Sequence, residues 1–167
     1  VAIDTGIILK DSKSKTNHVI LFDNSPYNAK RLKLHCKNLK IKTFWFPYNG
    51  YASDYPLCYD NLSLKEKRES SLKMSLTREK ATLKAIKLIK PEYLIPHSSD
   101  FYLNGPRSKE FYRVHDINFL DKKKYSERIE KKSGIKALAL YSKDHILFEN
   151  KNDIISIKTK EAERIKS

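Results

Sequence analysis

The stretch KPEYLIPHSSDF, from Lys90 to Phe101, decides how the rest of this sequence is interpreted. Pro91 stops a preceding helical pattern, and the apolar run from Tyr93 to Ile95 that follows is typical of a strand. The run delivers His97 at its end, followed by small and acidic side chains. A rigid strand that ends in histidine predicts an imidazole aimed into a functional site. The alternative interpretation is a loop histidine with no special role.

Strand and helix patterns alternate on both sides of this stretch, and they predict one α/β domain over residues 1–167. Strands are expected at 1–10, 18–22, 41–46 and 154–157, and a closing hairpin is expected from 135–141 and 145–148. Helices are expected at 26–39, 62–74, 77–90 and 122–132, with Thr77 as the N-cap of the third. The chain opens in a strand pattern without an initiator methionine, so we expect a fragment or a processed chain.

The composition favours an anionic partner. The chain has 34 lysines and arginines against 20 acidic residues, which gives a formal net charge of +14. Such a surplus attracts nucleic acid or other anions, although the lysines are spread along the chain and an AT-rich coding bias would produce the same excess. Cys36 and Cys58 are too few and too far apart for a zinc knuckle or a disulfide framework. We therefore expect a reducing, cytoplasmic location and, without a long apolar run, no membrane span.

A second polar side chain follows a strand pattern in the same way as His97. The run HVILF, from His18 to Phe22, gives way to Asp23 and then to Asn-Ser-Pro. An apolar run bounded by these residues is typical of a strand that enters a loop. Asp23 is therefore a candidate site residue, and the alternative is an Asx-turn or a helix cap that serves only the backbone.

A long irregular segment, PYNGYASDYP at 47–56, carries three tyrosines within eight residues. Loops of this length inside a compact domain are usually functional. We therefore expect the substrate-binding candidates Tyr48, Asn49, Tyr51 and Asp54 to line a cleft, with Arg107 placed to meet an anionic substrate. The alternative is a surface loop whose tyrosines pack locally.

Three stretches, in this order, resemble the C-terminal half of the metallo-β-lactamase fold. VILFD at 19–23 is similar to the strand that ends in the metal-bridging aspartate. The stretch TREKATLKAIKLIKPEYLIPH at 77–97 is similar to the helix and strand that lead to the last metal-binding histidine, notably in the ascorbate-phosphate-lactonase-like branch. FPYNGYASDYPLCY at 46–59, with FYLNG at 101–105, is similar to a branch near the CMP-sialic-acid hydroxylases.

The resemblance implies half of an αββα sandwich, with one mixed sheet and helices on one face. It implies that Asp23 and His97 bind divalent metal, with two zinc ions in a complete site and manganese or iron as alternatives. The implied reaction is attack of metal-bound hydroxide on an ester, lactone or phosphodiester of an anionic substrate, RNA included. In the hydroxylase-like branch a phenylalanine often replaces the histidine at the position of His97.

The family's leading His-x-His-x-Asp-His signature is absent, because no two of the five histidines are neighbours. Two ligands do not hold a zinc site, so we expect the chain alone to be inactive, and enzymatic only together with the half that carries the signature. That missing N-terminal half, or a second chain, is expected to cover the remaining apolar face of the sheet. The rival hypothesis is a non-catalytic basic α/β module that binds nucleic acid or another acidic partner.

Overall fold

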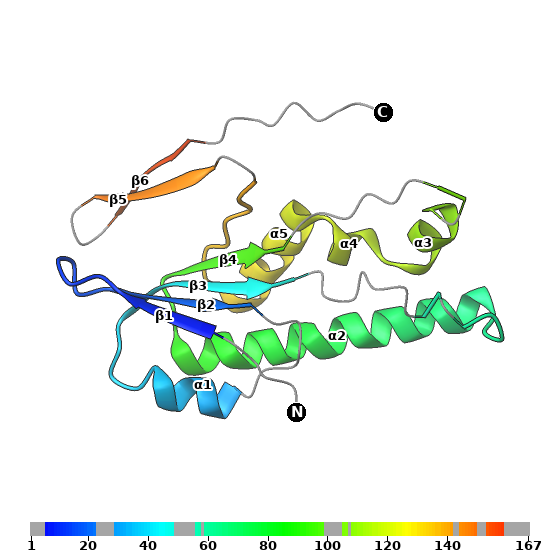
Figure 1. Cartoon of the computed structure of the whole chain (residues 1–167), viewed down its shortest axis with the longest axis horizontal. Coiled ribbons are helices and arrows are strands. Elements are labelled where there is room, and N and C mark those ends of the chain that lie inside the picture. Colours follow the sequence, from blue (N-terminus) through cyan, green and yellow to red (C-terminus); the bar gives the residue numbers. More distant parts are fainter. Residues whose placement is uncertain are drawn as a thin grey trace.

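The structure is a computed structural model that describes residues 6–22, 29–48, 56–57, 59–98, 105–106, 108–141, 144–149 and 153–158. Its strands are β1 (Gly6–Lys10), β2 (Asn17–Leu21), β3 (Ile41–Pro47), β4 (Tyr93–His97), β5 (His145–Glu149) and β6 (Asp153–Lys158). Its helices are α1 (Ala29–His35), α2 (Leu64–Ile89), α3 (Ser108–Val114), α4 (Ile117–Leu120) and α5 (Lys122–Ser133). Figure 1 shows the long helix α2 running along one side of the larger sheet.

The larger sheet has the strand order β1-β2-β3-β4, and β5 pairs with β6 in a separate two-stranded sheet. The strands β1 and β2 form an antiparallel hairpin, whereas β3 lies parallel to both of its neighbours. The predicted mixed α/β fold is therefore confirmed. Because β2, β3 and β4 run in the same direction, their carboxyl ends lie at one edge of the sheet, which we call the carboxyl edge.

The main core lies on one face of this sheet. Val19, Phe44 and Leu94 are neighbours in register on β2, β3 and β4, and each is at most 1% exposed. They join a single apolar cluster with residues of α2, α4 and α5, among them Ile86 and Ile129. Burying a large apolar side chain contributes about 1.5–3 kcal/mol, so this cluster is the main reason that the helices gather on that face.

Helix α2 is one continuous element, so the prediction of two helices divided before Thr77 was wrong. Ser63 caps the helix in a reciprocal capping box with Glu66. The Thr77 hydroxyl donates to the carbonyl of Lys73 (2.8 Å), which satisfies it inside the helix without a break. None of the helices among the described residues is both long enough and apolar enough to cross a membrane.

The C-terminal part of the chain also differs from the prediction. The segment around Ala137 was expected to pair with 145–148, but it bridges β4 in parallel at Leu94 instead. The Leu94 amide donates to the carbonyl of Lys136, and its carbonyl accepts from Leu138 (2.9 and 2.8 Å). The free edge of β4 thus takes up this segment, and β5 pairs with β6. Helices α3 and α4 were not predicted because segments of seven and four residues are too short to show a clear helical period.

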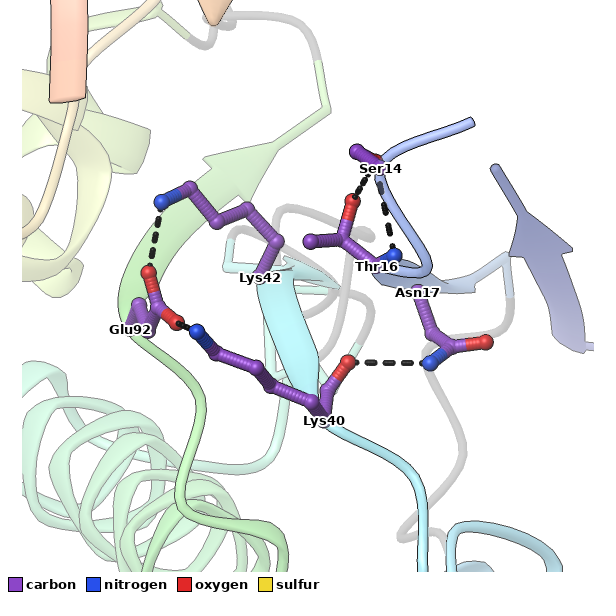
Figure 2. A network of polar contacts seen from close by, with 6 residues as sticks. All are labelled: Ser14, Thr16, Asn17, Lys40, Lys42 and Glu92. Carbon is purple, nitrogen blue, oxygen red and sulfur yellow. Dashed lines mark hydrogen bonds and ion pairs between the residues drawn. The ribbon is translucent and has the colours of Figure 1, made fainter. Parts of the chain in front are cut away.

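Polar contacts fix the amino-terminal edge of the sheet (Figure 2). The side chain of Lys42 is only 3% exposed, and its ammonium pairs with Glu92 at 2.6 Å. Glu92 also pairs with the exposed Lys40 at 3.1 Å, while the Asn17 side chain donates to the Lys40 carbonyl. These contacts tie the start of β3 to β2 and to the residue before β4. Burial would raise the pKa of Glu92, but its hydrogen bonds from Lys42 and Lys40 and their charges hold that pKa below its ordinary value.

A second, smaller apolar cluster consists of Leu57 and residues of α3 and α4, and a buried polar pair beside it involves α2. Ser71 of α2 and His115 share a hydrogen bond of 2.7 Å between the hydroxyl and Nδ1. The imidazole packs on the ring of Phe111, 4.4 Å between centroids, and its Nε2 has no hydrogen-bond partner. Burial lowers the pKa of His115 from 6.5 to about 4. The imidazole is therefore neutral at physiological pH.

Replacing Glu92 with glutamine should lower the free energy of unfolding by about 1–3 kcal/mol at pH 7, because Lys42 keeps its burial and loses its counter-charge. The contribution of Glu92 is fully present above its ordinary pKa and is lost as pH falls through the lowered value. Urea unfolding of the wild type and of Glu92→Gln at pH 7 and pH 3 measures the free energy of unfolding of each. The control Lys40→Met, at an exposed position, should change stability by less than about 0.5 kcal/mol. If Glu92→Gln lowered the stability as little as Lys40→Met does, a stabilising role of the Lys42–Glu92 ion pair would be contradicted.

His115 should make the fold less stable in mild acid. Below pH 6.5 the unfolded chain binds a proton that the buried imidazole accepts only near pH 4, so stability falls across that window. From pH 7.5 to pH 5.0 the loss from this group should be about 2 kcal/mol. His115→Phe should remove that part of the pH dependence in urea unfolding, whereas the exposed-site control His35→Gln should retain it. An unchanged pH dependence in His115→Phe would exclude the buried neutral state.

Candidate functional site

The carboxyl edge is the candidate site, because three parallel strands end there. β2 ends at Leu21, β3 at Pro47 and β4 at His97. The amide of Tyr48, directly after β3, donates to the carbonyl of His97 (3.2 Å) and holds the two strand ends together. Ligands of open parallel α/β sheets bind outside the carboxyl ends of the strands. His97 lies at this edge as the last residue of β4, and its role as a metal ligand stays a prediction.

His97, at the end of β4, reaches across the end of β3 to β2, the parallel strand on the far side of β3. Its Nε2 lies 2.5 Å from the carbonyl oxygen of Leu21, the last residue of β2. A carbonyl oxygen only accepts hydrogen bonds, so Nε2 carries the proton and Nδ1 keeps a lone pair in the neutral ring. Burial, and to a smaller extent the charge of Lys122, lower the pKa of His97, against the opposing effect of the Leu21 carbonyl. The ring is therefore a neutral imidazole that can accept a proton or bind a metal through Nδ1.

Most of the other predicted site residues lie outside the described residues. Asp23 follows Leu21 by two positions, and its role as a metal ligand stays a prediction, as do the roles of Asn49, Tyr51, Asp54 and Arg107. Tyr48 is described, and its side chain is 1% exposed. Its ring packs on that of Tyr125 (5.6 Å between centroids), so the observed contacts of Tyr48 are those of a core residue. Its contact with substrate remains a prediction.

Lys122 is a residue near this edge that sequence reasoning missed. It is the first residue of α5, and its ammonium donates to the carbonyl of Leu140 at 2.9 Å. The same ammonium lies 5.9 Å from the ring centroid of Tyr48 and 5.1 Å from that of Tyr141. In the sequence it belongs to a run of three lysines that indicates an ordinary solvated surface. The only available signal was a cation in a first helical turn, where the helix dipole disfavours it.

The donor atoms at this edge fit a divalent metal only in part. A neutral imidazole with a free Nδ1 suits zinc, manganese or iron. The part of the chain that the structure describes holds no group of three or more His, Cys, Asp and Glu side chains that could bind a metal ion. His97 would therefore supply one ligand, and the remaining ligands would come from Asp23 and from outside the described residues. Cys36 is not a candidate, because it is buried in the core and burial raises the pKa of its thiol.

A scan against protein-family models matches no family, and a search of curated proteins finds no similar sequence.

The hydrogen bond to Leu21 predicts a defined tautomer for His97. Long-range proton–nitrogen NMR at pH 7.5 should show the Nε2-protonated form, and the titration midpoint should lie below 6.5, because burial and Lys122 disfavour the cation. An Nδ1-protonated ring, or a midpoint above 6.5, would contradict this geometry. The exposed His35 supplies an internal reference in the same spectra.

Proposed function

We propose that this chain is part of a metal-dependent hydrolase that acts on an ester, lactone or phosphodiester of an anionic substrate. In this proposal His97 and Asp23 are the metal ligands that the chain contributes. The further ligands belong to a segment or chain that carries the family's clustered histidines. The resemblance of three ordered stretches to the metallo-β-lactamase fold motivates the assignment.

The observation that supports the proposal best is the contact of His97 Nε2 with the Leu21 carbonyl. Two of the three stretches that carry the resemblance end at Asp23 and at His97, 74 positions apart in the chain. The contact joins their strands across β3, so the backbone that leads to Asp23 starts beside the imidazole. Proteins also orient a metal-binding histidine in this way, by a hydrogen bond from the ring nitrogen that does not bind the metal.

A divalent metal at this edge would polarise the scissile group of the substrate and lower the pKa of a bound water. The residues of this chain would orient the metal-binding imidazole and hold the strand ends around it in place. The Leu21 carbonyl holds the proton of His97 on Nε2, so Nδ1 is ready to bind without loss of a proton. The buried Tyr48 and its contact to the His97 carbonyl keep the strand ends at a fixed spacing.

The partner proposed for this chain covers the outer side of the β1–β2 hairpin. Ile7 and Leu9 of β1 are 44% and 50% exposed, although both are large aliphatic residues in a strand. They are in register with Ile20 and His18 of β2, on the face opposite Val19. Exposed apolar side chains that adjoin on a sheet mark an interaction surface. We propose that the segment or chain with the missing ligands packs there.

The protein expressed from the complete reading frame should hydrolyse a lactone or a phosphodiester such as bis(p-nitrophenyl) phosphate in the presence of zinc or manganese. Asp23→Asn and His97→Ala should each lower the turnover by at least about 100-fold, because loss of an outer-shell partner alone costs 10–100-fold. His35→Ala, which changes an exposed histidine at the end of α1, should keep full activity.

The 167-residue chain alone should bind zinc weakly and with at most one ion, since a zinc site needs three or four protein ligands. Equilibrium dialysis with metal analysis measures this, and His97→Ala should weaken the residual binding while His35→Ala should not. Two tightly bound ions on the chain alone would refute the partial-site proposal. Salt-sensitive nucleic-acid binding without any hydrolysis by the complete protein would favour the basic-module hypothesis.

A further inference from the structure

Most of the buried charged side chains in the described part of the chain are paired with opposite charges. Lys42 is 3% exposed and lies 2.6 Å from Glu92. Lys67 is 6% exposed and lies 2.8 Å from Glu110, which joins α2 to α3. Buried charges need such partners because removal of an ion from water is costly.

Glu79 follows the same rule with the opposite sign. It is 2% exposed, and its two carboxylate oxygens contact Arg128 and Lys132 of α5. The buried carboxylate of Glu79 is thus neutralised by two cationic side chains that are themselves partly exposed.

Lys122 is the exception among the described residues. Lys122 is 8% exposed. Its ammonium contacts three neutral groups and, within the described part of the chain, forms no ion pair with a carboxylate. The partners are the Leu140 carbonyl and the rings of Tyr48 and Tyr141. Contacts with a carbonyl and with ring faces offset only part of the cost of burying an ammonium. The position at the start of α5 adds the unfavourable field of the helix dipole.

The unpaired cation lies by the candidate site. Tyr48, whose ring Lys122 contacts, directly follows β3 and binds the His97 carbonyl through its amide. The effect of the Lys122 charge on the pKa of His97 agrees with this proximity. The carboxyl edge therefore combines a buried ammonium with a neutral imidazole, and among the described residues the ammonium forms no ion pair with a carboxylate.

We propose that Lys122 is an anion-binding residue, which donates hydrogen bonds to an oxygen of a phosphoryl or carboxylate group of a small molecule at the carboxyl edge. An ammonium has three N–H donors, and the Leu140 carbonyl accepts from one, so two can serve an oxyanion. Lysine is a common point-charge partner of phosphate. The residue is buried and its ammonium lies over two tyrosine rings, so it suits one compact anionic group and not an extended polyanion such as a nucleic-acid backbone.

This inference deepens the proposed function, on which it rests for the substrate class, because it supplies a group that would recognise the anionic part of the substrate. Anion binding itself requires no metal and no missing ligands. The two proposals can therefore fail separately. Loss of the hydrolase proposal would leave phosphate binding by the chain intact, and loss of the Lys122 proposal would leave metal-dependent turnover intact.

The test is titration of the 167-residue chain with inorganic phosphate, at constant ionic strength and with EDTA present, followed by calorimetry or phosphorus NMR. Lys122→Met removes the charge and keeps most of the side-chain volume. It should weaken phosphate binding by about tenfold or more, since a hydrogen bond to a charged group is lost. Lys124→Met makes the same change of net charge at an exposed position of the same helix, and it should alter the affinity by less than about twofold.

Thermal unfolding separates ligand binding from a purely structural role. Phosphate should raise the unfolding temperature of the wild type and not that of Lys122→Met, while Lys122→Arg should keep a measurable part of the response. Acetate in place of phosphate distinguishes a carboxylate site from a phosphoryl site, and a response to either supports the proposal. Equal phosphate affinity in the wild type and Lys122→Met, an equal loss in Lys124→Met, or no response of the wild type to either anion would overturn it.

Discussion

Strand β3 is hydrogen-bonded along both of its edges, and this double pairing fixes the rest of the molecule. Parallel pairing with β2 and β4 aligns Val19, Phe44 and Leu94 in one row, on which the helices pack. The same alignment brings the ends of β2 and β4 to one edge, within reach of a single imidazole. The opposite edge is held by the Lys42–Glu92 pair, so polar contacts act at both ends of an apolar layer.

The sequence predicted the strands and helices whose patterns are long and regular. The strand before His97 and the aromatic strand β3 were found because apolar, β-branched and aromatic residues are concentrated in them. The division of α2 at Thr77 was wrong because a threonine in mid-helix satisfies its hydroxyl on the backbone and need not cap. The partner of the segment at Ala137 depends on which sheet edge is free, and no local pattern carries that information.

The candidate site was predictable to the extent that it depends on strand ends. His97 and Asp23 were singled out because each follows an apolar run, and the structure describes His97 at the end of β4. Lys122 could not be singled out in this way, since the burial of a lysine depends on Tyr48 and Tyr141, which are distant in sequence. In a chain with a net charge of +14, the sequence pattern around a buried lysine does not differ from that around the many solvated lysines.

The short link between α2 and β4 restricts insertions and deletions in this part of the chain. Lys90 ends the helix in the left-handed conformation (φ 48°, ψ 61°), and the Glu92 amide already bonds the Ile41 carbonyl on β3. Side chains alternate faces along a strand. An insertion or deletion of one residue here would turn Leu94 out of the core and reverse the side of the sheet on which the imidazole stands. A change of one residue in length at this junction is therefore more damaging than a single substitution.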